Sequence, residues 1–248
     1  MNTRELLFRQ LFDYDTWTYT YLIADPETRQ AALIDTVKEQ VQRDLKLVKE
    51  LGLHLEYVME THVHADHITG ADEIRGATGA KGVVGFGTQV SCADIRLDDG
   101  AHVELGRFRI KALATPGHTN GCMSFYMAGR VFTGDALLIR GTGRTDFQQG
   151  SSQSLYESIS QKLFTLPDDT LVCPAHDYRG MTVSTIEEEK KFNPRVGGGK
   201  TKDEFIAIMG NLKLAMPKKI QIAVPANLAC GSLAPSGNPE QAVSIRQG

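Results

Sequence analysis

The sequence predicts an α/β fold whose chemistry lies in loops that follow β-strands. Segments rich in aromatic and β-branched residues alternate with segments whose apolar residues recur at helical spacing. Histidine and aspartate side chains come directly after several of the strand-like segments. Because the ends of neighbouring strands meet at one edge of a sheet, loops there can enclose a site on a rigid scaffold. We therefore expect these side chains to converge.

The first part of the chain predicts two strands, a helix and a third strand. Residues 17–24 and 31–35 are strand-like, and the DPET between them is typical of a hairpin turn. Residues 37–52 place apolar residues at helical spacing and end at a glycine, which predicts an amphipathic helix. Residues 55–61 predict a buried strand that leads into THVHADH, and the ADEIRGATG beyond it predicts a short helix.

The middle of the chain is dominated by strands. Residues 81–86 predict a short strand, and residues 102–118 predict a hairpin that ends in a Pro-Gly turn carrying His118. The next stretch, GCMSFYMAGRVFTGDALL, predicts two strands joined at Ala-Gly-Arg, of which the second stops at Gly134 and Asp135. Each candidate ligand here again follows a strand.

The last third of the chain turns helical. Residues 154–166 carry leucine and isoleucine at four-residue spacing, which predicts a helix, and residues 170–177 predict a strand that ends in His176. Helices are then predicted for STIEEEKKF and for TKDEFIAIMGNL, where Thr201 and Glu204 have the spacing of a capping box. The tail from residue 228 has the Pro, Gly and Ser content of a loose end.

Composition limits the possible partners. The chain has 248 residues, of which 41% are hydrophobic and 24 are glycines, as in an ordinary globular protein. A formal net charge of -3 and a pI near 6.2 give no general attraction to nucleic acid or to an anionic membrane. We expect small-molecule ligands and neither a nucleic acid nor a membrane as partner. The expected organisation is a single domain, residues 1–248, with a short helical C-terminal extension over about 182–248.

The N-terminus and the cysteines predict a cytoplasmic protein. MNTRELLFRQLFDYD contains acidic residues and no apolar run, unlike a secretory signal or a transit peptide. No run of about 20 apolar residues is present that could span a bilayer. The four cysteines form no CxxC pair and are scattered, which is typical of reduced thiols: Cys92, Cys122, Cys173 and Cys230.

The stretch THVHADH, residues 61–67, concentrates metal donors. His62 and His64 are two residues apart, which places them on one side of an extended segment, and Asp66 and His67 follow. Imidazole and carboxylate together suit Zn, Fe, Mn or Ni, and donors of the same types come later in the chain at His118, Asp135 and His176. Separate structural roles for all of these donors are not expected, so the sequence predicts a metal centre. The number of metal ions is left open.

These motifs resemble the metallo-β-lactamase superfamily. The resemblance rests on T-H-x-H-x-D-H, on the later T-P-G-H-T and on F-T-G-D. It implies an αββα sandwich with the metal site at one edge of the two sheets. The superfamily pattern for two metals would use one set of three donors for the first ion, a second set for the other and an aspartate as bridge: His62, His64 and His118, then Asp66, His67 and His176, with Asp135 between them. A dinuclear zinc hydrolase similar to glyoxalase II, acting on a hydroxyacylglutathione thioester, is therefore an alternative.

Longer segments resemble the persulfide dioxygenase branch of this superfamily. They are GTGRTDFQQG (141–150), residues 164–195, EFIAIMGNL (204–212) and AVPANLACG (223–231). This resemblance implies one Fe(II) per chain, held by His62, His118 and Asp135, and a homodimer. The remaining donors would surround the iron and hydrogen-bond its ligands or water: His64, Asp66, His67 and His176. Two imidazoles and one carboxylate on one side of Fe(II) leave about three positions for a sulfur and O2.

The same resemblance implies an iron-dependent sulfur dioxygenase acting on glutathione persulfide, with O2 and water as co-substrates and sulfite and glutathione as products. Arg144 and Arg195 would bind the substrate carboxylates. Tyr178 would offer a phenol near the metal, although a packed core tyrosine is an equal reading. Met209 and Cys230 match family positions beside the substrate pocket; the alternatives are a core methionine and an inert buried thiol. A silent member that only senses sulfur is a further, different class.

Overall fold

Alternating side chains along two neighbouring strands create two separate cores. The structure is a computed structural model that describes residues 5–232 and 243–245. In β2 (Thr18–Ala24), Tyr21 and Ile23 point into the cluster between the two sheets, whereas Leu22 and Ala24 belong to a second cluster on the outer face. The neighbouring strand β3 (Gln30–Ile34) divides its residues in the same way. Such strands need a layer on both faces, because side chains alternate across a sheet.

The first sheet begins with a hairpin and continues in parallel. Its strand order is β1-β2-β3-β4-β5-β6-β13. The first three strands are antiparallel, and from β3 onward each described strand runs parallel to its neighbour. The remaining strands are β1 (Leu7–Asp13), β4 (His54–Met59), β5 (Lys81–Gly85), β6 (Ile95–Leu97) and β13 (Val243–Ile245).

The second sheet has the order β12-β11-β10-β9-β8-β7. It is antiparallel apart from the parallel pair of β10 with β11. Its strands are β7 (His102–Leu105), β8 (Phe108–Ala114), β9 (Met123–Met127), β10 (Arg130–Gly134), β11 (Leu171–Pro174) and β12 (Ser184–Thr185). The two sheets pack face to face, and Tyr21 meets Phe132 across the interface with ring centroids 5.1 Å apart.

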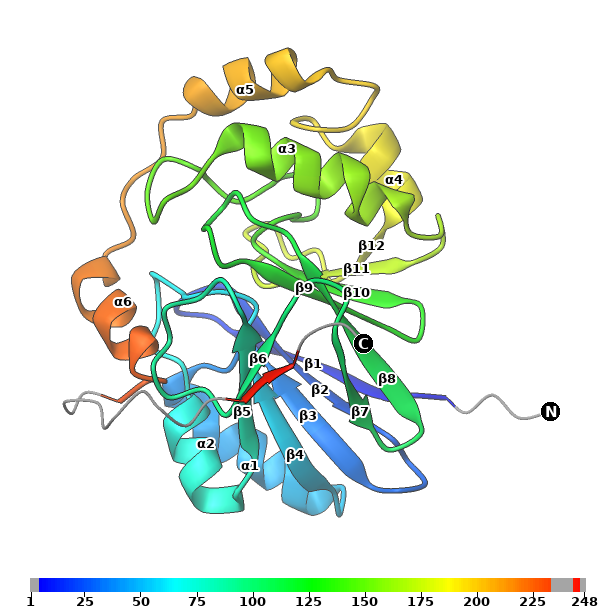
Figure 1. Cartoon of the computed structure of the whole chain (residues 1–248), viewed down its shortest axis with the longest axis vertical. Coiled ribbons are helices and arrows are strands. Elements are labelled where there is room, and N and C mark those ends of the chain that lie inside the picture. The colour runs from blue at the N-terminus through cyan, green and yellow to red at the C-terminus, as the bar shows by residue number, and fades with distance from the viewer. Residues whose placement is uncertain (1–4, 233–242, 246–248) are drawn as a thin grey trace.

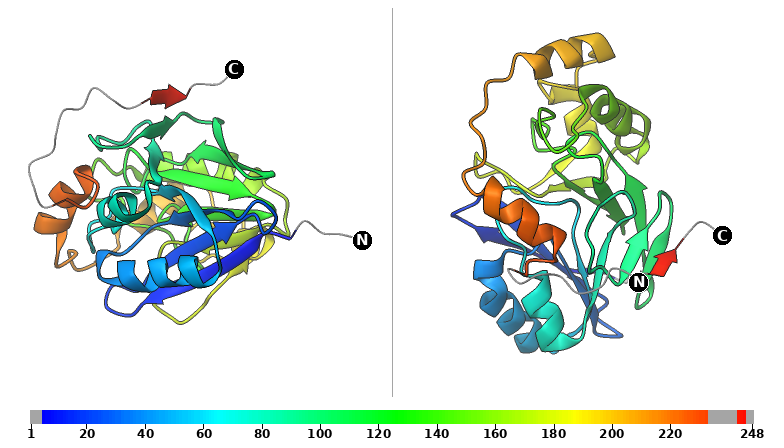
Figure 2. Two further views of the ribbon diagram at one scale, coloured as in Figure 1. Left: turned by 90° about the horizontal axis from the view of Figure 1, so that it is seen from below. Right: turned by 60° about the vertical axis from the view of Figure 1, so that its left-hand side comes forward.

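Helices cover both outer faces, which gives four layers (Figures 1 and 2). The first sheet is covered by α1 (Val41–Glu50), preceded by the 3-10 turn η1 (Lys38–Gln40), and by α2 (Ala71–Thr78). Around the second sheet lie α3 (Ser152–Gln161), η2 (Leu163–Thr165), α4 (Ile186–Phe192) and α5 (Lys202–Gly210). A last helix, α6 (Ile220–Leu228), lies beside the edge formed by α2 and β5 and is drawn in orange. The expected αββα sandwich is confirmed.

Most expected elements are present, and their ends differ by a few residues. Leu155, Ile159 and Leu163 are fully buried, and Thr201 with Glu204 forms a complete capping box. Strands β1 and β6 and helix α6 are not predicted from the sequence, and Ser184–Thr185, expected at the start of a helix, forms strand β12 instead. The tail was expected to be loose; Val243–Ile245 instead pairs with β6, and residues 233–242 and 246–248 lie outside the described residues. Within the described ranges, no helix is long and apolar enough to cross a membrane.

The four cysteines are not all free thiols. Cys92 and Cys230 form a disulfide, whereas Cys122 and Cys173 are free and buried. The expectation of four reduced thiols was therefore wrong for one pair. The two partners are 138 residues apart in the sequence, and the fold brings them together at the end of α6. Spacing alone does not reveal a pair of this kind.

Candidate metal centre

Four strand ends deliver the candidate metal donors to one edge of the sandwich. His62 and His64 follow β4, His118 follows β8, Asp135 follows β10 and His176 follows β11. The donors therefore converge, as strand ends at a sheet edge should. In the part of the chain that the structure describes, donor atoms within 4.8 Å of one another form three groups: His62, His118 and Asp135; His64, Asp66, His67 and His176; and Asp35, Glu60 and His64.

A backbone carbonyl fixes the tautomer of His118. The Nδ1 atom of His118 lies 2.7 Å from the carbonyl oxygen of Arg144. A carbonyl oxygen only accepts hydrogen bonds, so Nδ1 carries the proton and Nε2 keeps its lone pair. Nε2 lies 3.6 Å from the Oδ2 atom of Asp135. His118 is thus prepared to bind a cation through Nε2, next to a carboxylate.

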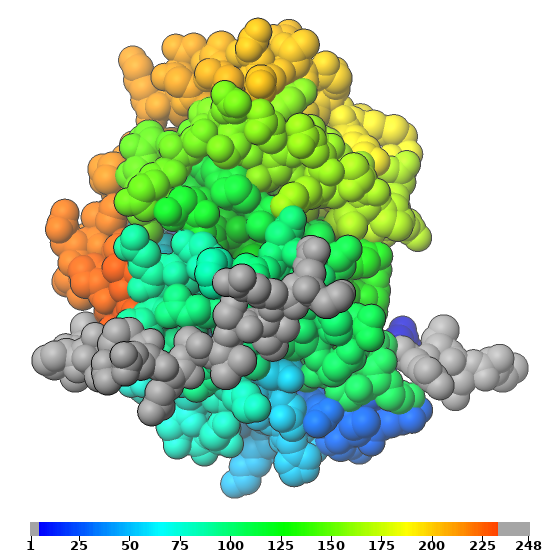
Figure 3. All heavy atoms as spheres, viewed as in Figure 1, coloured from blue at the N-terminus to red at the C-terminus, as the bar shows by residue number. Residues whose placement is uncertain are grey.

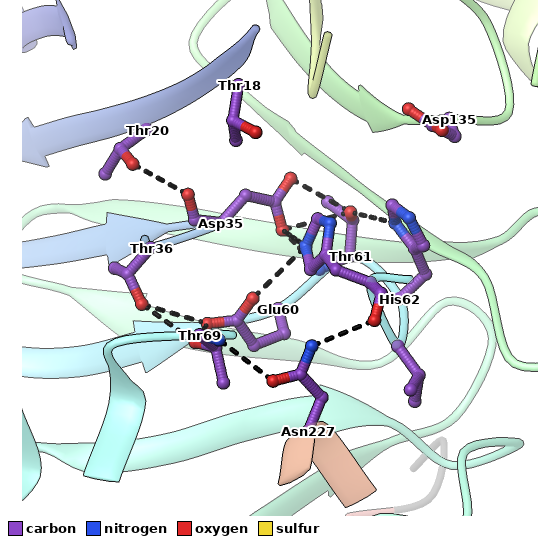
Figure 4. Close-up of polar contacts among 12 residues, drawn as sticks. Thr18, Thr20, Asp35, Thr36, Glu60, Thr61, His62, Thr69, Asp135 and Asn227 are labelled. Carbon is purple, nitrogen blue, oxygen red and sulfur yellow. Dashed lines mark hydrogen bonds and ion pairs between the residues drawn. The ribbon is translucent and has the colours of Figure 1, made fainter. Parts of the chain in front are cut away.

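A threonine and a buried aspartate do the same for His62. The hydroxyl oxygen of Thr61 lies 2.9 and 3.0 Å from the two carboxylate oxygens of Asp35, so its proton goes to Asp35. The hydroxyl then accepts a hydrogen bond from Nδ1 of His62, 2.9 Å away, and the lone pair of that ring remains on Nε2 (Figure 4). Burial, helped by the neighbouring ring of His64, holds the pKa of His62 well below its usual value of 6.5. A neutral imidazole of this kind is a competent metal ligand.

Asp135 is oriented by His176. Nδ1 of His176 lies 2.8 Å from Oδ1 of Asp135, and Nε2 of the same ring lies 3.0 Å from Oδ2 of Asp66. Burial alone would raise the pKa of Asp135, but the His176 ring beside it holds this pKa below its usual range. Asp135 therefore remains a carboxylate, and its Oδ2 atom faces His118. Both nitrogens of His176 are engaged by carboxylates.

The second group of donors has its own support. Nε2 of His64 lies 3.3 Å from both Asp35 and Glu60. Although burial opposes protonation, these hydrogen bonds raise the pKa of His64 to about 10. Nδ1 of His67 lies 3.1 Å from Asp66. His64 is thus held by two buried carboxylates of the first sheet, on the side of the ring opposite Nδ1.

These donors fit a transition-metal ion. Buried polar atoms nearly always have a partner. Among the described residues, however, Nδ1 of His64 and Nε2 of His67 have none. Nitrogens of this kind, beside neutral imidazoles and carboxylates, are typical of a site completed by a cation. The triad of His62, His118 and Asp135 has its lone pairs prepared by hydrogen bonds on the far side of each side chain.

A glycine allows the loop after β10 to approach the site. A Cβ atom on Gly143 would lie 2.8 Å from Nδ1 of His118 and even closer to the carbonyl oxygen of Asp135. Real Cβ atoms are essentially never found at such distances. This position therefore excludes every other residue type, which explains the second glycine of GTGR.

A cavity of about 590 Å³ opens above the triad. Its lining includes His62, His118 and Asp135, and also residues 214–219, which lie between α5 and α6. The volume is within the usual range for a small-molecule site. Of the residues expected to bind substrate, the cavity is lined by Arg144, Arg195 and Tyr178.

Arg144 and Arg195 play different parts. The guanidinium of Arg144 is paired with Asp146 at 2.6 Å and donates to the carbonyl oxygen of Ala215 at 2.6 Å, so it ties down residues 214–219. Arg195 donates to the carbonyl oxygen of Thr142. Burial, reinforced by the nearby Arg179, lowers the pKa of Arg195. Within residues 5–232 and 243–245, Arg195 forms no ion pair with a carboxylate, so this cation is available to an anionic ligand.

The other expected residues lie at different places. Tyr178 stacks on the ring of His176, with centroids 6.0 Å apart, and is exposed at the cavity mouth, so it is not a core tyrosine. Met209 is buried in the cluster outside the second sheet and contacts the hydroxyl of Thr142 at 3.6 Å. Cys230 is bonded to Cys92, away from the residues that line the cavity. Met209 and Cys230 therefore do not contact the cavity directly.

Several contributing residues were not found from the sequence. Asp35 and Glu60 hold His64, and Asp35 also accepts from the backbone N–H of Thr61 at 2.8 Å. Asn227 of α6 binds the backbone of the donor loop. One signal was available: Asp35, like the metal donors, directly follows a strand. Glu60 directly follows β4 and carries the same signal, whereas Asn227 lies in a helix and carries none.

The comparisons with known proteins agree with this geometry. Residues 17–85 and 92–176 match the metallo-β-lactamase superfamily model. The chain is 50% identical over 236 residues to the human mitochondrial persulfide dioxygenase ETHE1, which covers 93% of this chain and 91% of the human protein. The crystal structure of ETHE1 from Myxococcus xanthus superposes with a TM-score of 0.89 at 56% identity, over 91% of this chain and 100% of that one. The chain belongs to the metallo-β-lactamase superfamily, in its persulfide dioxygenase branch.

Hydrolases of the superfamily are more distant. A hydroxyacylglutathione hydrolase from Cereibacter sphaeroides is 32% identical over 164 residues, which covers 64% of this chain and 62% of the hydrolase. The match to the human dioxygenase extends over most of both chains, and thus includes residues well beyond the metal donors. The superfamily motif accounts for the full set of metal donors. The assignment to the persulfide dioxygenase branch rests on similarity in the residues outside that set.

Proposed function

We propose that this chain is a persulfide dioxygenase with a single Fe(II), which oxidises glutathione persulfide with O2 and water to glutathione and sulfite in sulfide detoxification. One persulfide, one O2 and one water give one thiol, one sulfite and two protons. The observation that carries the proposal is the triad of His62, His118 and Asp135, whose free donor atoms lie together. The 50% identity to the human persulfide dioxygenase supports the choice of reaction.

His62, His118 and Asp135 would hold the metal, and the protein keeps them ready for it. Bound Fe(II) would supply the redox chemistry and the adjacent open positions for a sulfur and O2. Thr61 and the carbonyl of Arg144 hold the protons of the two imidazoles on Nδ1, away from the metal side. These partners act as orienting groups of the kind that usually accompany metal ligands.

The substrate would enter the 590 Å³ cavity with its carboxylates toward the cations. Arg195 is the best candidate for a direct contact, because it is partly desolvated and pairs with no carboxylate of the described chain. Arg144 would act mainly through the segment that it ties down. Met209 would act through Thr142, whose carbonyl positions Arg195.

Tyr178 would contribute at the outer end of the site. Its ring is parallel to that of His176, with an angle of 1° between the planes, and the exposed residue lines the cavity. We propose that this phenol donates a hydrogen bond to the substrate sulfur or to bound oxygen. Residues 214–219 on the opposite side would limit the entry of water.

The alternative is a dinuclear zinc thioester hydrolase. The two unpartnered nitrogens of His64 and His67 favour it, because they would suit a second cation. Two features oppose it. Both nitrogens of His176 are engaged by carboxylates. Asp35 and Glu60 raise the pKa of His64 to about 10, so Nδ1 carries a proton that a second cation would have to displace.

Metal content together with two assays distinguishes the two functions. The protein is purified without added metal, and Fe and Zn are measured per chain. O2 consumption is followed with glutathione persulfide, and hydrolysis is followed with a hydroxyacylglutathione thioester. We expect close to one Fe per chain, O2 uptake and no thioester cleavage. Two Zn per chain with thioester cleavage and no O2 uptake would establish the hydrolase instead.

We further propose a cytoplasmic location and a homodimeric assembly. The human relative is mitochondrial by name. Cell fractionation tests the proposed location. The homodimer implied by the resemblance is tested by light scattering at several protein concentrations.

A further inference from the structure

Helix α6 reaches the donor loop through one buried side chain. The Nδ2 group of Asn227 donates to the carbonyl oxygens of His64 and His67, at 2.9 and 2.8 Å. Its Oδ1 atom accepts from the backbone N–H of Thr69 at 2.9 Å. Figure 4 shows Asn227 between α6 and this loop. Three backbone groups of the segment that carries the metal donors thus depend on a residue 158 or more positions away.

These three bonds are costly to lose. The backbone N–H and C=O groups of this loop are not part of a β-sheet hydrogen-bond ladder. A buried backbone group without a hydrogen-bond partner is strongly unfavourable. Asn227 is 5% exposed, so water cannot easily replace it. Because the amide supplies both donors and an acceptor at once, no other residue type of the same size satisfies the set.

Helix α6 itself is weakly anchored by apolar contacts. Its buried residues are Ala223, Ala226 and Asn227, whereas Ile222 is 60% exposed. Two alanines bury little apolar surface, and Pro225 lies inside the helix. Other bonds must therefore keep α6 in place.

The anchors lie at the end of the helix. Cys230 is bonded to Cys92, and the backbone N–H groups of Ser91 and Asp72 donate to the carbonyl oxygens of Leu228 and Cys230, both at 3.0 Å. The disulfide therefore joins α6 to the segment between β5 and β6. In the space-filling view, the orange residues of α6 lie directly against this cyan surface (Figure 3).

We propose that Asn227 is a positioning residue of the metal centre and that the Cys92–Cys230 disulfide keeps it in position, so that the metal loop responds to thiol redox state. The oxidation is a thiol–disulfide exchange: two protein thiols and one glutathione disulfide give one protein disulfide and two glutathione thiols. The S–S bond of the glutathione disulfide breaks, and one forms in the protein. The inference rests on the proposed function only in taking residues 62–67 as the metal-bearing segment.

The first test concerns Asn227. Wild type, Asn227→Asp and the control Asn211→Asp are loaded with Co(II); Asn211 lies exposed at the end of α5 and bonds only within its own helix. The visible spectrum and the rate of metal loss to a chelator are measured. For Asn227→Asp we expect a changed spectrum and roughly tenfold faster loss of Co(II) than in wild type, together with a lowered unfolding temperature, because two buried carbonyl oxygens lose their donor. The control should match wild type.

An unchanged spectrum and rate in Asn227→Asp would overturn the positioning role. If the introduced charge prevents folding, Asn227→Ala takes its place, because it removes all three bonds without adding a charge. The same outcomes then decide. Co(II) binding does not require iron or a persulfide, so failure of this test is distinct from failure of the proposed function.

The second test concerns the disulfide. After equilibration with glutathione disulfide and denaturation, wild type should expose two free thiols, those of Cys122 and Cys173. Amide hydrogen exchange of residues 61–70 is then compared in oxidised, reduced and Cys92→Ser protein, all without metal. We expect roughly tenfold faster exchange on reduction, and equally fast exchange in Cys92→Ser with or without reductant. Four free thiols, or equal exchange in oxidised and reduced wild type, would overturn the redox link.

Discussion

The carbonyl oxygen of Arg144 lies 2.7 Å from Nδ1 of His118, while the guanidinium of the same arginine donates to the carbonyl oxygen of Ala215 at 2.6 Å. The backbone of Arg144 therefore positions the candidate metal ligand His118, and the side chain of Arg144 holds the cavity wall. Because these are different atoms, substitution of the side chain separates the two contributions.

Arg144→Ala should weaken substrate use and retain iron. The carbonyl that holds His118 remains, but the bonds to Asp146 and Ala215 are lost. We expect KM for glutathione persulfide to rise by roughly tenfold, with Fe per chain unchanged. Arg109→Ala is the matched control, since Arg109 forms an exposed pair with Glu104 at 3.1 Å. Loss of iron in Arg144→Ala would contradict this division of roles.

His118→Ala and His67→Ala should differ in metal content. His118 belongs to the triad, so its removal should abolish iron binding and O2 uptake together. His67 belongs to the second group, so His67→Ala should keep most of the iron, with circular dichroism confirming the fold. Metal analysis by mass spectrometry measures both. Equal loss of metal in the two variants would instead favour a dinuclear centre.

Asp35→Asn should loosen the donor loop. Asp35 accepts from the backbone and hydroxyl of Thr61 and from His64, and it is 1% exposed. We expect the variant to lose about 2 kcal/mol of unfolding free energy and to bind iron roughly tenfold or more weakly. Denaturation and chelator competition measure these effects. The exposed Asp169→Asn should behave as wild type.

Asp44 predicts a pH dependence of stability. This buried residue of α1 has an unpartnered Oδ2 atom, and burial raises its pKa from 3.8 to about 6. The folded protein then holds the proton of Asp44 more tightly than the unfolded chain does. The contribution of this carboxyl group to the free energy of unfolding is therefore fully present below about pH 4 and is lost as pH rises through about 6. The free energy of unfolding of Asp44→Asn, compared with that of wild type, should therefore rise by on the order of 2 kcal/mol between pH 4 and 7.5. Urea denaturation of both metal-free proteins at the two pH values checks this. An equal difference in unfolding free energy between variant and wild type at both pH values would contradict it.

The convergence of the candidate metal donors was the easiest feature of the site to predict. The donors follow strands, and strand ends converge, so the motif and the topology both indicated them. The buried partners were harder, because nothing in the sequence distinguishes Glu60 from any other acidic residue after a strand. Helix α6 escaped prediction because IQIAVPANL contains a proline and no amphipathic pattern. The disulfide depends on tertiary structure alone.

The residues expected to bind substrate were placed only in part. Arg144, Arg195 and Tyr178 line the cavity, and of the two arginines Arg195 has no acidic partner among the described residues. Met209 and Cys230 do not line it, since a family position reports proximity to a pocket and not the direction of a side chain. Packing decides that direction.

The cavity wall of residues 214–219 runs directly into α6, and α6 carries the side chain that braces the metal loop. An engineer who grafts this stretch from a relative to change substrate preference would therefore alter metal affinity in the same step. Chimeras whose exchange point lies before or after residue 219 would show whether substrate preference and metal affinity can be changed independently.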